Sequence, residues 1–260
     1  MLPEVQTQGR RSRTYNKPPL SEAIYEFFAD PSGTNQWSEE SFARLAMLIR
    51  DFDAKEERLI DRDLIVNVQP SPNLGFNQQV SEPRVRLRRW NAEGTRAVQY
   101  GAHMCAYHVL PPYGHFEHHI PMIRNLLDNY LSRAQPERMA WTGQRAINIV
   151  RLPVAGPPAA NYFEIYPKLP EALARIHSPL AVQVQTAEFE NGSAVVNLAL
   201  RLVEDGHAVY ILDVYARSKD PMPANVDDLL AWQQRAHEAL SASFELSITD
   251  DSRALFEVVS

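Results

Sequence analysis

The sequence predicts an α+β fold with two similar halves, each in the element order β-α-β-β-β-α. Three observations predict it: alternating segments joined by hairpin dipeptides, segments whose apolar residues recur every three or four positions, and the same order of elements before and after residue 140. Strands linked by hairpins form antiparallel sheets, and amphipathic helices cover them. We therefore expect largely antiparallel sheets with the helices packed on one face, and two sheets joined edge to edge into one continuous curved sheet.

The N-terminal half is predicted to span residues 17–140, after a tail of residues 1–16. The tail contains three arginines without periodicity, which predicts a solvated segment or a basic arm that reaches a phosphate backbone. Strands are expected at 22–28, 64–68, 84–90, 97–103 and 105–110, helices at 38–52 and 116–131, and a loop at 70–83. Ser38 is a suitable N-cap for the first helix.

The C-terminal half, residues 141–260, is predicted to repeat this order. Strands are expected at 146–152, 180–189, 194–203 and 208–217, and helices at 169–176 and 226–244. The dipeptides Asn191-Gly192 and Asp205-Gly206 predict two-residue hairpin turns, because both of their residues can adopt positive φ.

The composition is that of a globular protein that needs no disulfides. The 260 residues are 45% hydrophobic and 22% charged, and Cys105 is the single cysteine. No apolar run reaches the length of a membrane span, and the first residues are polar rather than signal-like. We therefore expect a cytoplasmic protein with no membrane partner.

An arginine stripe is the first feature that predicts binding. Arg84, Arg86 and Arg88, with Arg89, are expected on one strand face, either solvated and paired with acids or binding an anion such as a nucleotide or nucleic acid. Trp90 and Tyr100 are expected either to stack on a base or to pack within the sheet. The predicted ligand-binding or anion-binding residues are therefore Arg84, Arg86, Arg88, Arg89, Trp90 and Tyr100.

A histidine cluster is the second feature. Five histidines fall within 17 residues: His103, His108, His115, His118 and His119. His115 and His119 are four positions apart, so on a helix they would share a face and, with His118, could bind zinc or another divalent transition metal. The alternatives are ordinary histidines around a strand-to-helix turn, which would need no cofactor, and a pH-responsive patch.

The sequence assigns no catalytic residue. It contains no phosphate-binding glycine loop, dinucleotide fingerprint or nucleophile elbow. Cys105 is expected to be buried and inert; as a nucleophile it would need a base such as His103 or His108. These observations favour a non-enzymatic protein.

Three short segments carry a family resemblance: Asn16-Lys17-Pro18-Pro19-Leu20 running into Glu22-Ala23, then Leu110-Pro111-Pro112-Tyr113-Gly114, and finally His237, Phe244 and Ile248-Thr249. Together they resemble an uncharacterised, sporadically distributed bacterial protein family of about 260 residues. The resemblance implies a horizontally moved gene, of the kind that encodes antiviral defence or toxin–antitoxin modules. It assigns no functional residue.

Three functions remain open. The first is a non-enzymatic binding or regulatory protein that engages a partner protein, encoded by a neighbouring gene, or forms a homo-oligomer. The second is a nucleic-acid or nucleotide binder that uses the arginine stripe, although the formal net charge of −6 argues against a dedicated nucleic-acid binder. The third is a metal-dependent hydrolase at the histidine cluster.

Overall fold

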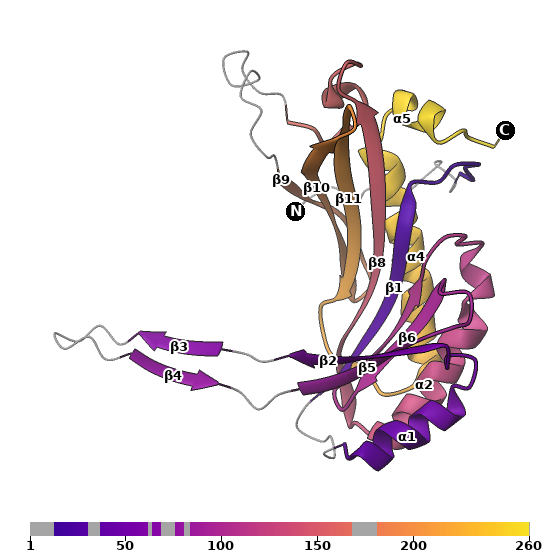
Figure 1. Ribbon diagram of the computed structural model, residues 1–260, viewed down its shortest axis with the longest axis vertical. Helices are drawn as coiled ribbons and strands as arrows, with labels where there is room; N and C mark the ends of the chain where they lie inside the picture. The colour runs from indigo at the N-terminus through magenta and orange to yellow at the C-terminus, as the bar shows by residue number, and fades with distance from the viewer. Residues whose placement is uncertain are drawn as a thin grey trace.

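The computed structural model confirms the predicted fold class. It describes residues 13–30, 37–61, 64–68, 76–80, 84–167 and 181–259. These residues form an α+β structure around a ten-stranded antiparallel sheet (Figure 1). From one edge to the other, the sheet contains β2 (Lys55–Asp61), β5 (Arg84–Trp90), β6 (Arg96–Gly101), β7 (Met104–Val109), β1 (Leu20–Ala29), β8 (Arg138–Pro153), β11 (His207–Ser218), β10 (Gly192–Glu204) and β9 (Ala181–Phe189), with β12 (Met222–Pro223) beside β8.

The two predicted halves meet in the middle of this sheet. β1 and β8, the first strands of the two halves, pair antiparallel with Ile24 opposite Arg145 and Phe28 opposite Trp141. The remaining strands of each half extend outward from this central pair. The strand direction turns progressively from β9 to β2, as expected from the twist of β-strands (Figure 1).

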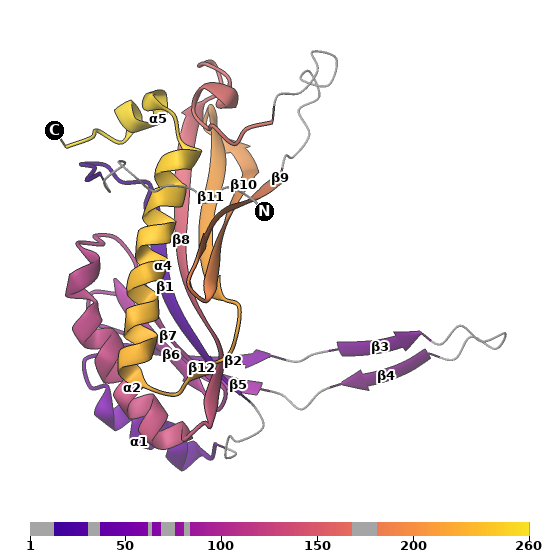
Figure 2. The ribbon, with the colours of Figure 1, turned by 180° about the vertical axis from the view of Figure 1, so that it is seen from behind.

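The larger helices lie on one face of the sheet, as predicted (Figures 1 and 2). The helical segments are α1 (Glu39–Leu48), η2 (Phe116–His118), α2 (Ile120–Ala134), η3 (Ala159–Asn161), α4 (Val226–Ser247) and α5 (Asp250–Leu255). The Ser38 side chain caps α1 as expected, and Asn225 caps α4. No helix in the described parts of the chain is long and apolar enough to cross a membrane.

The core lies between the sheet and α1, α2 and α4. Tyr25 and Phe27 of β1, Tyr100 of β6 and Trp232 of α4 are fully buried there. Because successive side chains of a strand point to opposite faces, the alternate residues of each strand lie on the other side. We call the face beneath the helices the covered face and the opposite one the open face.

Polar side chains inside the core explain why β8 is longer than the predicted strand at 146–152. Thr142 and Gln144 of β8 are buried on the covered face, so this part of the strand lacks an apolar alternation. Thr142 donates to the Glu26 carbonyl at 2.9 Å and accepts from Gln233 Nε2 of α4 at 3.0 Å. Buried polar groups are stable when they are hydrogen-bonded in this way.

A two-stranded arm corrects the prediction of a loop at 70–83. β3 (Leu64–Val68) pairs with β4 (Phe76–Val80), and this arm projects beyond β2 and β5 on the side of the open face (Figures 1 and 2). β2 was not predicted, because the sequence of Lys55–Asp61 shows no apolar alternation. The predicted helix at 169–176 lies outside the described residues.

Two further predictions need correction. The first C-terminal hairpin turns at Glu190 and Asn191, and Gly192 already belongs to β10. Gly192 is needed there because a Cβ atom would lie 2.3 Å from the Phe189 ring. The described end of the predicted tail is anchored rather than solvated, since Tyr15 pairs with Val258.

Candidate functional site: the open face of the sheet

The open face is where the structure gathers side chains that the core does not use. Among the described elements, α1, α2 and α4 pack on the opposite face (Figures 1 and 2). The alternation of each strand and the registers of its pairs place the following charged or polar residues on the open face: Glu22, Glu26, Glu57, Arg84, Arg86, Arg88, Gln99, His108, Arg145, Asn197, Asp213, Tyr215 and Arg217.

Three of the four arginines of the stripe lie on the open face. Arg84, Arg86 and Arg88 alternate with Val85 and Leu87, which face the core. The Arg88 guanidinium donates to Gln99 Oε1 at 3.0 and 2.8 Å, and its Nη1 lies 4.0 Å from a Glu57 carboxylate oxygen. The expected pairing of this stripe with polar groups on neighbouring strands is therefore present for Arg88. Trp90 shares the face and is half-buried.

Arg89 and Tyr100 were wrongly grouped with this stripe. Strand alternation turns both onto the covered face. Tyr100 is fully buried, so it cannot stack on a base. Arg89 donates from Nη1 to the Ala46 carbonyl of α1 at 3.1 Å, and its Nε lies 3.2 Å from Glu56 Oε2.

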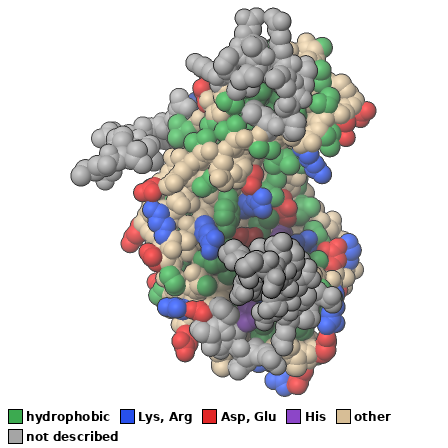
Figure 3. All heavy atoms as spheres, turned by 90° about the vertical axis from the view of Figure 1, so that its left-hand side faces the viewer, with side chains coloured by type: hydrophobic (Ala, Val, Ile, Leu, Met, Phe, Trp, Pro, Cys, Tyr) green, Lys and Arg blue, Asp and Glu red, His purple; other side chains and the backbone are tan. Residues whose placement is uncertain are grey.

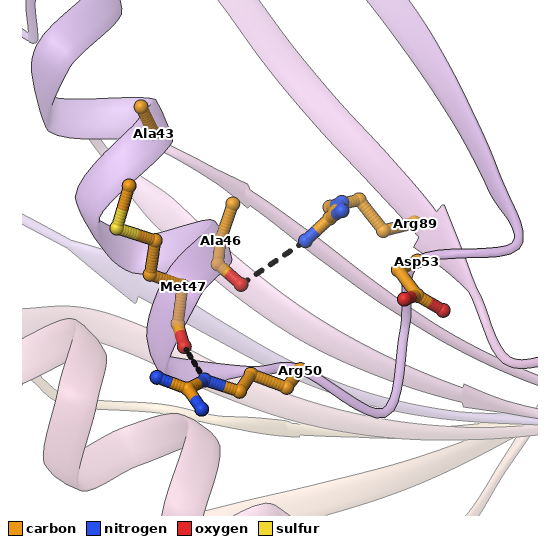
Figure 4. A pocket seen from close by; sticks show the side chains of 6 residues that line it. All are labelled: Ala43, Ala46, Met47, Arg50, Asp53 and Arg89. Atoms are coloured by element: carbon orange, nitrogen blue, oxygen red, sulfur yellow. Dashed lines mark hydrogen bonds between the residues drawn. The ribbon is translucent and has the colours of Figure 1, made fainter.

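A shallow hollow lies beside Arg89 (Figure 4). Its walls come from α1 and the following turn, where Arg50 donates to the Met47 carbonyl at 3.1 Å. The Arg89 and Arg50 side chains thus hold the C-terminal end of α1. Both guanidinium groups donate hydrogen bonds to carbonyls at this helix end, so the arginines around the hollow stabilise the end of α1.

Two contacts between ionisable side chains occupy the middle of the open face, where the halves join. His108 Nδ1 lies 2.8 Å from Glu22 Oε1, and the His108 side chain is only 7% exposed. Arg145 donates from Nε and Nη2 to the two Asp213 carboxylate oxygens, both at 2.8 Å. This bidentate geometry is the strongest form of an arginine–carboxylate contact.

The ionisable groups around these pairs have shifted pKa values. A hydrogen bond with His108 lowers the pKa of Glu22, whereas burial raises the pKa of Glu26, four residues along the same strand face. Burial also raises the pKa of Tyr215 to about 12, so this phenol stays protonated at neutral pH. Shifted pKa values in a cluster are a mark of functional sites, and also of structural ion pairs.

An apolar cluster separate from the main core lies on the same face. It contains Ile24, Met104 and Ala106, with Phe28 packed against it. Phe28 stacks on Trp141 with ring centroids 3.8 Å apart and an interplanar angle of 16°. The Arg217 guanidinium lies over the Trp141 ring, 4.4 Å from its centroid. On the side seen in Figure 3, basic, acidic and hydrophobic side chains are intermixed.

The rings of His115 and His118 are in edge contact with centroids 5.5 Å apart, but His119 does not complete a metal-binding set with them. His119 is buried and its Nε2 lies 2.7 Å from the Tyr113 carbonyl, while His115 and His118 are exposed. The predicted helix begins only at Ile120, because Pro121 occupies its first turn, so His115 and His119 share no helical face. Within the described residues, no three histidine, cysteine or acidic side chains are placed to hold a metal ion.

Cys105 lies on the covered face and is fully buried. Burial raises the pKa of its thiol well above the usual value, which suppresses the reactive thiolate. His108 points to the open face, and His103 lies in the turn between β6 and β7. The first of the two predicted bases, His108, therefore lies on the opposite face from Cys105, and the second, His103, lies outside the strand.

Sequence reasoning missed most of the open face. Glu26, Phe28, Trp141, Asp213 and Arg217 come together only because β1 pairs with β8 and β8 with β11. One signal was present: Glu22 and Glu26 alternate with Ala23, Tyr25 and Phe27, which marks a strand with a polar face.

No protein-family model matches the chain, and no curated protein matches its sequence. The resemblance of the Asn16–Leu20 segment to an uncharacterised bacterial family therefore stays a prediction.

Proposed function

We propose that this chain is a non-enzymatic binding protein that engages a partner protein through the open face. The observation that carries the proposal is the composition of that face. Aromatic and apolar side chains are interleaved with arginines and with ionisable side chains that are paired within the chain. Protein interfaces have apolar, aromatic and arginine-rich centres of this kind.

The pairing of the ionisable groups supports binding rather than catalysis. A general acid or base must reach the proton of a substrate, and a nucleophile needs a base within hydrogen-bonding distance. His108 is held by Glu22, and Asp213 is held by Arg145. Nδ1 of His108 and both carboxylate oxygens of Asp213 are thus engaged within the sheet.

The position of the arm also favours the open face as the surface that binds the partner. β3 and β4 project from the edge of the sheet toward the side of the open face, so a partner seated on that face would also lie beside the arm (Figures 1 and 2). The product of a neighbouring gene, in a bacterial defence or toxin–antitoxin module, is the first partner to test. A second copy of the chain is the alternative.

A nucleic acid is the second ligand class, and the shared face of Arg84, Arg86 and Arg88 favours it. However, Glu22, Glu26, Glu57 and Asp213 lie among these arginines on the same face, so the face has no continuous basic track for a phosphate backbone. The formal net charge is −6, whereas nucleic-acid binders concentrate positive charge on the contact surface. We therefore rank a protein partner first.

Site-specific photo-cross-linking tests the proposal. A benzophenone amino acid is placed at Leu59 or Ser193, which are half-buried on the open face, and at Met47 or Leu246, which are exposed on α1 and α4. The chain is then illuminated with the purified product of the neighbouring gene. We expect a cross-linked product from the open-face positions only.

Three results would contradict the proposal. These are cross-links from the helix-side positions alone, an absence of cross-links at all four positions with each neighbouring gene product, and tight, salt-sensitive binding of an oligonucleotide through the open face. Sedimentation of the chain alone shows whether the cross-linked partner is a second copy, which would keep the open face as the docking surface.

A further inference from the structure

A strip of side chains crosses the open face close to the base of the arm. We call it the Arg86–Arg217 strip: Arg86 on β5, Met104 on β7, Phe28 on β1, Trp141 on β8 and Arg217 on β11. The registers place the first four side by side, whereas Arg217 is opposite Gly143 and joins the strip because its guanidinium lies over the Trp141 ring. Arg86 is opposite Gly101, which is opposite Met104; Met104 is opposite Phe28, and Phe28 is opposite Trp141.

The apolar middle of the strip is rigid. Phe28 stacks on one face of the Trp141 ring, and the Arg217 guanidinium covers the other face from the neighbouring strand. Met104 is 4% exposed, whereas Phe28 and Trp141 are half-buried and still reach the surface. Rings held in place before binding lose little conformational entropy when a partner covers them.

An arginine stands at each end of the strip. The Arg86 side chain begins directly over Gly101, where an added Cβ would lie 3.0 Å from Arg86 Cγ. Arg217 is exposed at the other end. The Arg217 guanidinium lies over Trp141 on β8, four strand spacings from β5, so the strip spans about 19 Å from the base of Arg86, at about 4.8 Å for each spacing.

We propose that the Arg86–Arg217 strip is the docking point for an acidic segment of the partner protein. Apolar residues of that segment pack against Phe28 and Trp141, and a carboxylate at each end meets Arg86 or Arg217. An extended peptide covers the strip in about six residues, which sets the spacing of the two acids. This inference rests on the proposed function and names the chemistry of the partner.

Single-stranded nucleic acid fits the strip less well. Bases bind proteins by stacking on the faces of aromatic rings. Both faces of the Trp141 ring are already occupied, by Phe28 and by Arg217. Carboxylates of a peptide need only the guanidinium groups at the ends, and apolar side chains can pack against the ring edges.

The test uses three fluorescein-labelled peptides and measures their binding to the full chain by fluorescence anisotropy. The first has glutamates about six residues apart with leucine and phenylalanine between them. The second has lysines in place of the glutamates, and the third keeps the glutamates around a serine-glycine centre. We expect the first peptide to bind at least about tenfold more tightly than either of the others.

Four variants of the chain locate the binding. Arg217→Glu and Trp141→Ala should each weaken the first peptide at least about tenfold, and Arg217→Glu should improve binding of the lysine peptide. Arg124→Glu is the charge control, because Arg124 is exposed on α2. Met47→Ala is the apolar control, because Met47 is 66% exposed on α1. Both controls should bind the first peptide as the wild type does.

Equal binding of the three peptides, binding of none, or equal losses in Arg217→Glu and Arg124→Glu would overturn the inference. Tighter binding of a mixed-sequence oligonucleotide than of the first peptide, lost in the Arg217→Glu variant, would also overturn the inference in favour of nucleic acid. Cross-links from Leu59 and Ser193 to a partner segment without acidic residues would rule out an acidic docking segment but would leave the proposed function standing.

Discussion

The two faces of the central sheet are built from the same strands but differ in how their side chains are stabilised. On the covered face, Tyr25, Phe27 and Trp232 lie in one continuous core beneath the helices. On the open face, Glu22 and Arg145 are held by partners on adjacent strands. The comparison indicates that the covered face holds the fold together, whereas the open face carries paired side chains, and we propose that this face contacts another molecule.

Adjacent phenylalanines on β1 give the largest expected contrast. Phe27 is fully buried on the covered face, and Phe28 is half-buried on the open face. Phe27→Ala should lower the free energy of unfolding by about 3–5 kcal/mol, because it leaves a cavity in the core. Phe28→Ala should cost about 1–2 kcal/mol, because less apolar surface returns to water. Urea denaturation measures both, and equal losses would contradict the distinction between the two faces.

Two ion pairs that involve β8 give an intermediate contrast. The Asp213 side chain is 10% exposed and accepts two hydrogen bonds from Arg145, so Asp213→Ala should cost about 1–3 kcal/mol. Glu204 is 45% exposed in its pair with Arg151, so Glu204→Ala should change stability by less than about 0.5 kcal/mol. A loss in Glu204→Ala as large as that in Asp213→Ala, in the same denaturation assay, would show that the bidentate contact adds no stability.

Two glutamates on the open side of β1 should give opposite dependences on pH. The pKa of Glu22 is lowered by its hydrogen bond with His108, so its stabilising effect is complete above the usual carboxyl pKa of about 4.3 and is lost as pH falls through the lowered pKa. The pKa of Glu26 is raised by burial, so its stabilising effect is complete below the usual pKa and is lost as pH rises through the raised one.

The variants Glu22→Gln and Glu26→Gln therefore separate the two effects. Relative to the wild type, Glu22→Gln should lose stability as pH rises from the lowered pKa toward the usual value. Glu26→Gln should gain stability relative to the wild type as pH rises from the usual value through the raised pKa. Thermal unfolding across this pH range measures both trends, and slopes of the same sign would contradict the assigned environments.

Local patterns were enough to predict the fold class. Alternation located β1, β5, β10 and β11, and the Asp205-Gly206 turn has positive φ at both residues, as expected. The register between β1 and β8 could not be predicted, because residues such as Phe28 and Trp141 are far apart in the chain and their local patterns do not specify which strands pair. The cluster on the open face depends on this register.

The histidines and Arg89 show why residue types alone mislead. Five histidines close in sequence suggested a metal site, but a strand and a helix start direct His108 and His119 to different sides of the sheet. Arg89 follows Arg88 directly, so strand alternation places it on the opposite face. In both cases the backbone period, rather than proximity in sequence, decides which side chains meet.

Hydroxyl-radical footprinting of the chain with and without its purified partner tests the central claim most directly. The oxidation rates of Phe28 and Trp141 report on the open face, and that of Met47 reports on the helix side. If the partner binds the open face, oxidation of Phe28 and Trp141 should fall on complex formation while that of Met47 stays the same. Protection of Met47 with unchanged oxidation of Trp141 would contradict this account.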